Sequence, residues 1–160
     1  MIRGLAVVML FAVARLPAPE PAQLGFGTVR VFTPASVLFQ VMDVGAATPA
    51  SAVTTVSFDS AVLGLGQVLR ISVKADSHIV MPGGGVIPST TVAWSASNAT
   101  NGVGVNGSLS NLTFTTVFQG NAGTTSGRVD LTWTLAAPPT SVTAGTGVAT
   151  LHWKFEAVTP

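Results

Sequence analysis

The chain has 160 residues, of which 48% are hydrophobic and only 8% are charged, and its formal net charge is +1. This balance excludes a basic field for nucleic acid, and the length suits one domain that can bury a core. The absence of cysteine excludes disulfides, thiolate zinc sites and cysteine nucleophiles.

The N-terminal segment has the pattern of a secretory signal. Arg3 precedes an apolar run from Leu5 to Ala14, and Ala12-Val13-Ala14 is an A-x-A cleavage site. The run is about half as long as a membrane-spanning helix requires. We expect residues 1–14 to be a signal peptide, which would make the membrane a partner only during export. The alternative is a retained apolar segment, either a short membrane anchor or a buried helix.

Residues 15–27 are predicted to be a Pro-rich extended linker, because "PAPEPAQ" contains three prolines in seven residues. After it, short runs rich in β-branched residues are separated by Gly, Pro, Asn and Ser. The predicted strands cover 28–33, 36–44, 52–58, 67–75, 90–97, 112–119, 128–135 and a last strand that starts at Leu151.

Several of these runs alternate with the period of two that is typical of a half-buried strand. The residues expected to face inward are Leu69, Ile71, Val73, Leu112, Phe114, Thr116, Phe118, Val129, Leu131, Trp133, Leu135, Leu151, Trp153, Phe155 and Ala157. The three tryptophans, Trp94, Trp133 and Trp153, lie on the apolar phase of their strands, so we predict that they anchor the core rather than bind a ligand.

No segment after residue 16 has the helical period of 3.6 residues. The spacing of the strands therefore predicts an all-β domain over residues 28–160. We expect an immunoglobulin-like antiparallel sandwich, with a jelly roll as the alternative.

The C-terminal region resembles known surface proteins. The stretch "SVTAGTGVATLHWKFEAV" is similar to the ending of bacterial fimbrial subunits and spore-coat-U-like domains, in which an Ala-Gly-Thr turn precedes a last alternating strand. Trp133-Thr134-Leu135 matches the motif of the WxL cell-wall-binding domains, and "LHWKFEAVTP" resembles their distal motif with Phe155 in place of Leu. The chain lacks the cysteine pair of many fimbrial subunits. The resemblance implies a bacterial surface β-sandwich.

The sequence shows no catalytic or metal-binding motif. His78 and His152 are far apart and have no metal-ligand spacing, and "MPGGGVIP" lacks the lysine and the helix of a phosphate loop. The acidic residues are scattered, and Asp130 and Glu156 lie on outward phases. We therefore expect no enzyme activity, no cofactor and no metal site, although a single calcium ion at a loop aspartate (Asp43, Asp59 or Asp76) stays open.

The stretch "NATNGVGVNGSLSNLT" contains three N-x-S/T sequons, at Asn98, Asn106 and Asn111. In an exported protein these asparagines are candidate glycosylation sites. The same residue types are also ordinary turn formers, so the stretch is equally consistent with an unmodified loop.

The segment "QLGFGTVRVFT" (23–33) follows the Pro-rich linker and is the candidate donor strand, which would complete the sheet of a neighbouring copy. Its candidate donor side chains are Leu24, Phe26, Val29 and Val31. The two pairs fall on opposite phases, which a bulge at Gly27 would reconcile. The alternative is an ordinary first strand of the chain's own sheet.

These features favour a secreted or cell-surface structural subunit of an extracellular filament or surface layer. It would assemble with copies of itself by strand donation or edge pairing, because a nearly uncharged surface is inexpensive to bury. One alternative is a secreted module that binds cell wall or polysaccharide, with surface glycans as its partner. The other is a secreted accessory domain held by its N-terminal segment.

Overall fold

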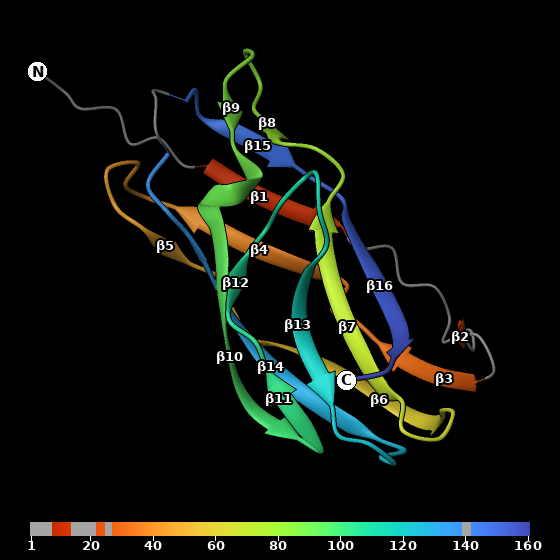
Figure 1. The fold of residues 1–160 in the computed structure, drawn as a ribbon. Coiled ribbons are helices and arrows are strands. Elements are labelled where there is room, and N and C mark those ends of the chain that lie inside the picture. Colours follow the sequence, from red (N-terminus) through yellow and green to blue (C-terminus); the bar gives the residue numbers. More distant parts are fainter. Residues whose placement is uncertain (1–7, 14–21, 25–26, 139–141) are drawn as a thin grey trace, which may run out of the picture.

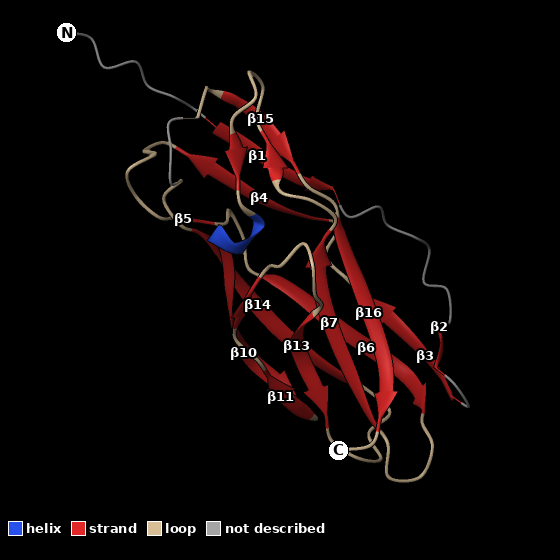
Figure 2. Ribbon diagram, turned by 45° about the horizontal axis from the view of Figure 1, so that its top comes forward, coloured by secondary structure: helices blue, strands red, loops and turns tan. Residues whose placement is uncertain are grey.

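The computed structural model describes residues 8–13, 22–24, 27–138 and 142–160. In this part of the chain the fold is all-β, as the sequence predicts, and it contains no α-helix. The one helical element is a single 3-10 turn, η1 (Ser89–Thr91). Figure 2 shows this turn in blue among the strands.

The strands of the described residues are numbered β1 to β16 in chain order (Figure 1). The first eight are β1 (Val8–Val13), β2 (Ala22–Leu24), β3 (Gly27–Phe32), β4 (Ser36–Val41), β5 (Thr48–Pro49), β6 (Thr54–Val62), β7 (Val68–Ala75) and β8 (Ile79–Val80). The second eight are β9 (Val86–Ile87), β10 (Val92–Thr100), β11 (Gly102–Gly104), β12 (Gly107–Ser108), β13 (Thr115–Gly120), β14 (Gly127–Leu135), β15 (Gly145–Val148) and β16 (Leu151–Val158).

The strands form three sheets. The seven-strand sheet has the order β12-β10-β14-β6-β3-β2, with β5 paired to β14. The four-strand sheet has the order β11-β13-β7-β16, and the five-strand sheet has the order β4-β1-β15-β8-β9. The C-terminal stretch passes from one sheet to another at 149–150, because β15 belongs to the five-strand sheet and β16 to the four-strand sheet.

The core lies between the seven-strand and four-strand sheets, which pack as a sandwich (Figures 1 and 2). Phe58 of β6 and Phe118 of β13 meet across it with ring centroids 5.7 Å apart. The five-strand sheet closes one end, where Phe39 and Ile79 join the same apolar cluster. This architecture confirms the predicted sandwich.

The period-two pattern predicts the core faces of two central strands correctly. In β14 the predicted inward residues are all buried, and in β7 Leu69, Ile71 and Val73 are buried. Ser72 of β7 is buried as well, although it lies on the outward phase. Its hydroxyl group lies 3.5 Å from Oγ1 of Thr116 on the neighbouring strand β13.

The predicted inward phase of residues 112–119 is correct for Phe118 but wrong for Leu112 and Phe114. Leu112 is 81% exposed and Phe114 is 38% exposed, and both precede β13. The pairing of β13 with β7 shifts between Thr116 and Phe118, so Val117 and Phe118 are both buried. A bulge of this kind breaks the alternation on which the prediction depends.

One pairing differs from the antiparallel arrangement that the sequence predicts. β1 runs parallel to β15, while all the other strand pairs described are antiparallel. The strands of Trp133 and Trp153, β14 and β16, look alike in sequence but belong to different sheets. Similar inward patterns show only that both strands face the same core.

The bulge expected at Gly27 is found elsewhere. The pairing of β3 with β6 shifts between Thr28 and Arg30, and the extra residue belongs to β6. Ser60 of β6 has a φ of 54°, a left-handed conformation that non-glycine residues seldom adopt. The bulge therefore bends β6 near its end, beside the loop that follows it.

Candidate functional site

The strand β1 lies in the interior of the five-strand sheet, between β4 and β15 (Figure 1). It pairs antiparallel with β4 along its whole length, with Val8 opposite Val41 and Val13 opposite Ser36. On its other side it pairs in parallel with Gly145–Val148 of β15. Within the described residues β4 and β15 are not paired with each other, so β1 alone joins them.

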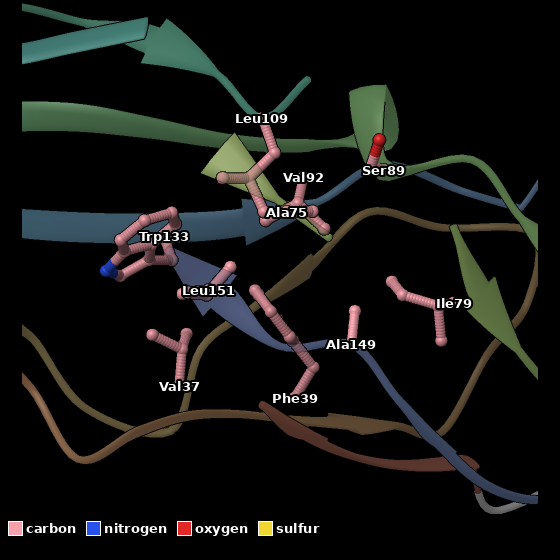
Figure 3. Close-up of a pocket in the computed structure, with 10 residues that line it drawn as sticks. All are labelled: Val37, Phe39, Ala75, Ile79, Ser89, Val92, Leu109, Trp133, Ala149 and Leu151. Atoms are coloured by element: carbon pink, nitrogen blue, oxygen red, sulfur yellow. The ribbon is translucent and has the colours of Figure 1, made fainter. Parts of the chain in front are cut away.

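The sheet is apolar on its inner side at this place. Val37, Phe39 and Val41 of β4 are buried, and so is Ala149, directly after β15. A cavity of about 20 Å³ lies beneath them, and Figure 3 shows the side chains that converge on it. Its lining residues are Val37, Phe39, Ala75, Ile79, Ser89, Val92, Leu109, Trp133, Ala149 and Leu151. A void this small and this apolar is a packing gap rather than a ligand site.

The structure places three of the four predicted donor residues, and they lie in two elements. Val29 and Val31 belong to β3, which pairs with β6 of the chain's own sheet, and Val29 is buried. Leu24 ends β2, where it pairs with Gly27. Phe26 lies outside the described residues. The segment therefore pairs as an ordinary strand of the chain's own sheet, which is the alternative that the sequence left open, although β1 precedes it.

Trp94 and Trp133 are buried and are core anchors by position. The indole Nε1 of Trp133 donates a hydrogen bond to Thr54 Oγ1 at 2.7 Å, and that of Trp94 donates to the carbonyl oxygen of Val105 at 2.8 Å. Trp153 packs against the same core but is only half-buried. Its Nε1 is buried and has no acceptor in the described part of the chain.

Two of the three sequon asparagines use their side chains within the fold. Asn98 Nδ2 donates to Asp130 Oδ2 at 2.9 Å, and Asn106 Oδ1 accepts the backbone N–H of Ala96 at 2.8 Å. Asn111 lies in the stretch between β12 and β13 and is half-exposed. Asn98 and Asn106 are exposed, so all three positions are accessible to some degree, and their glycosylation stays a prediction.

His78 forms a contact that sequence reasoning missed. Its Nδ1 accepts the backbone N–H of Ser89 at 3.1 Å and lies 3.4 Å from Ser89 Oγ. Because the backbone N–H already occupies Nδ1, that nitrogen is poorly placed to take a proton from the hydroxyl group. The pair fastens η1 to the loop after β7. No spacing in the sequence signals it, because the two residues meet only through the β8–β9 hairpin.

Two carboxylates are held in the charged form by hydrogen bonds. Asn98, followed by Thr55, donates to the carboxylate of Asp130 and lowers its pKa. Burial opposes ionisation of Asp76, but hydrogen bonds from Thr150 and Ser77 outweigh it, and the pKa of Asp76 is lowered. Each carboxylate ties together two segments that are far apart in sequence.

Phe114 lies at the outer face of the four-strand sheet with two lysines beside it. The ammonium nitrogen of Lys74 is 5.2 Å from the centroid of its ring, and that of Lys154 is 5.6 Å away. Lys154 also forms an ion pair with Glu156 at 2.7 Å. Sequence reasoning missed this cluster, because the alternating pattern predicts Phe114 to lie in the core.

Neither a comparison with models of known protein families nor a comparison with curated proteins finds a match to this chain. Among the residues that the structure describes, no helix is long and apolar enough to cross a membrane. The same residues contain no group of three or more His, Asp or Glu side chains placed to hold a metal ion.

Proposed function

We propose that this chain is a structural subunit of an extracellular filament or surface layer, built from copies of itself by donation of a β-strand. The observation that carries the proposal is the position of β1 between β4 and β15. Both neighbours lie far from β1 in sequence, and β1 alone joins them among the described residues. A strand in this position can come from the same chain or from another copy with identical pairings.

We call the position of β1 between β4 and β15 the slot. An empty slot would raise the free energy of the folded chain. The backbone N–H and C=O groups of Val8–Val13 satisfy the facing groups of β4 along its length and those of Gly145–Val148. Without β1 these groups would form two facing, unpaired edges above an apolar layer that includes Phe39. Unpaired edges of this kind recruit strands from other chains. We therefore expect the slot to be filled at all times, either by β1 of the same chain or by β1 of another copy.

The connection of β1 to the rest of the chain suits exchange between copies. Eight residues (14–21) separate β1 from β2, and three of them are proline. Proline lacks the N–H that a sheet requires, so this sequence favours a tether over a further strand. A strand that is joined to its domain by a tether can be exchanged at low cost, since each copy keeps the same contacts. Exchange that does not close on itself produces a filament.

The donor in this proposal is β1 rather than the segment that contains Leu24, Phe26, Val29 and Val31. Val29 is buried in the core, and β3 pairs with β6, so donation of β3 would open the seven-strand sheet. Donation of β1 leaves that sheet intact. The proposal requires that residues 8–13 stay in the mature subunit, which is the retained apolar segment that the sequence allows.

A reversible disulfide tests the proposal, because the chain has no cysteine of its own. Met9 and Gln40 are directly opposed in the antiparallel pair of β1 and β4, and cysteines at opposed positions come within disulfide reach. The variant that combines Met9→Cys with Gln40→Cys is oxidised at low concentration, which fastens β1 to its own chain. A control variant combines Ser57→Cys with Arg128→Cys, an opposed pair of β6 and β14 that leaves β1 free.

Images of frozen, unstained protein then give the result. We expect filaments from the unmodified chain and from the oxidised control, none from the oxidised Met9–Gln40 variant, and filaments again after its reduction. Filaments from the oxidised Met9–Gln40 variant would overturn donation by β1. Dispersed subunits from the unmodified chain would overturn the filament itself.

A further inference from the structure

The outer face of the four-strand sheet carries an unusual share of the positive charge of this chain. Arg70, Lys74 and Lys154 are three of the five basic residues in residues 22–160. All three lie on the outward phase of β7 or β16, where Arg70 is opposite Glu156 and Lys74 is opposite His152. Residues 22–160 contain five basic and five acidic side chains, so this basic face belongs to a neutral domain.

Two exposed apolar side chains lie beside these basic residues. Phe114 is 38% exposed and Leu112 is 81% exposed, at the side of the sheet where β13 begins. The ammonium groups of Lys74 and Lys154 converge on the ring of Phe114 at 5.2 Å and 5.6 Å from its centroid. Two ammonium groups therefore lie within about 6 Å of the centroid of one aromatic ring.

Ion pairs neutralise only part of this positive charge. Lys154 is paired with Glu156 at 2.7 Å, but Lys74 forms no ion pair with any residue that the structure describes. The nearby cross-strand groups are neutral and polar: Ser72 Oγ lies 3.5 Å from Thr116 Oγ1. The face thus combines an ammonium group without an ion-pair partner among the described residues and a partly exposed aromatic ring on an extended surface.

We propose that this face, formed by Phe114, Lys74, Lys154 and Arg70, binds an acidic polysaccharide. A sugar ring presents C–H groups that pack on an aromatic ring, and the carboxylate of a uronic acid pairs with an ammonium group. A nucleic acid fits less well, because three cations beside Glu156 offer few phosphate contacts.

The site is independent of the slot filled by β1. The slot belongs to the five-strand sheet, whereas this face belongs to β7, β13 and β16 (Figure 1). A dispersed subunit and a filament would both present it. Binding of an acidic polysaccharide at this face therefore does not depend on strand donation. In an assembly, the same face would hold acidic glycans at the surface.

Binding of the full chain to immobilised polygalacturonate tests the inference, with neutral dextran and poly-glutamate as comparison matrices. The variants are Phe114→Ala and Lys74→Gln. Their matched controls are Phe32→Ala, an equally exposed phenylalanine of the seven-strand sheet, and Arg128→Gln of the same sheet.

We expect selective binding to polygalacturonate that weakens as salt is added. Phe114→Ala and Lys74→Gln should each weaken it by about tenfold, and the two controls by less than about twofold. Equal binding to dextran, an equal effect of the control variants, or no binding would overturn the inference. Equal or tighter binding to poly-glutamate would overturn the polysaccharide as the partner and point to an acidic peptide.

Discussion

The indole rings of Trp94 and Trp133 pack with their centroids 5.2 Å apart and their planes tilted by 56°. The two residues are also directly opposed in the pairing of β10 with β14. A tilted aromatic pair contributes beyond the area it buries, and each indole N–H has an acceptor inside the fold. This pair therefore fixes the register of the two strands at the centre of the seven-strand sheet.

The tryptophans should differ in how much they contribute to stability. Trp133→Phe replaces a fully buried indole by a smaller ring and removes the N–H that donates to Thr54. We therefore expect the free energy of unfolding to fall by about 1–3 kcal/mol. Trp153→Phe removes a buried N–H that has no acceptor among the described residues, and we expect a loss below about 1 kcal/mol. Urea denaturation followed by circular dichroism measures both. A larger loss for Trp153→Phe would contradict the assignment of the anchors.

Gly127, at the start of β14, should not tolerate a side chain. A Cβ atom there would lie 2.6 Å from Cε1 of Phe58 and 2.8 Å from the carbonyl oxygen of Thr100, and the backbone oxygen cannot move freely. We expect Gly127→Ala to lower the free energy of unfolding by about 1–3 kcal/mol. Gly85→Ala is the control, because the nearest atom to its Cβ would be a side-chain carbon at 3.4 Å. Equal effects of the two changes on the denaturation midpoint would contradict the packing described here.

Acid should weaken the fold partly through Asp130. Hydrogen bonds from Asn98 and Thr55 hold its pKa below the ordinary value of 3.8. The folded state thus favours the charged form, so the contribution to stability is complete above the unfolded pKa and is lost as the pH falls through the folded pKa. We expect Asp130→Asn to lower the stability of the folded protein at neutral pH. We also expect it to reduce the loss of stability that the unmodified protein shows below about pH 4. Unchanged pH dependence in thermal denaturation would contradict the role of these hydrogen bonds.

The mature protein should retain residues 8–13 if β1 is the donated strand. We expect the intact mass of protein recovered from the outside of cells to include this segment. A protein that begins at Arg15, after the A-x-A motif, would lack β1 and would contradict its role in assembly. The signal-peptide prediction for residues 1–14 would then be correct in full.

The strands whose sequence alternates strictly are the ones that could be predicted. β14 and the inward residues of β7 follow period two, because both strands are central and face one core. The phase of Leu112 and Phe114 could not be predicted, since the bulge before Phe118 leaves no mark in residue type. The Phe114 cluster was missed for the same reason.

The role of residues 8–13 could not be predicted from local sequence either. An apolar run after an arginine has the same appearance in a signal peptide and in an interior strand, and the pairing of residues 8–13 with β4 and β15 depends on long-range contacts. The short strands β8 and β9 were missed because each contributes two residues beside a glycine-rich turn. Their pairing depends on long-range contacts rather than on periodicity.

The most direct test of strand donation mixes two single-cysteine chains, one with Met9→Cys and one with Gln40→Cys, that differ in mass. A disulfide between the two positions can then form only if β1 of one chain pairs with β4 of another. The control mixture replaces Gln40→Cys by Ser36→Cys, which is opposite Val13 and four residues away along the strand.

We predict a mixed cross-linked species from the first mixture and several-fold less from the control, measured by mass spectrometry after mild oxidation. Equal amounts from the two mixtures, or no mixed species under conditions in which filaments form, would contradict donation of β1.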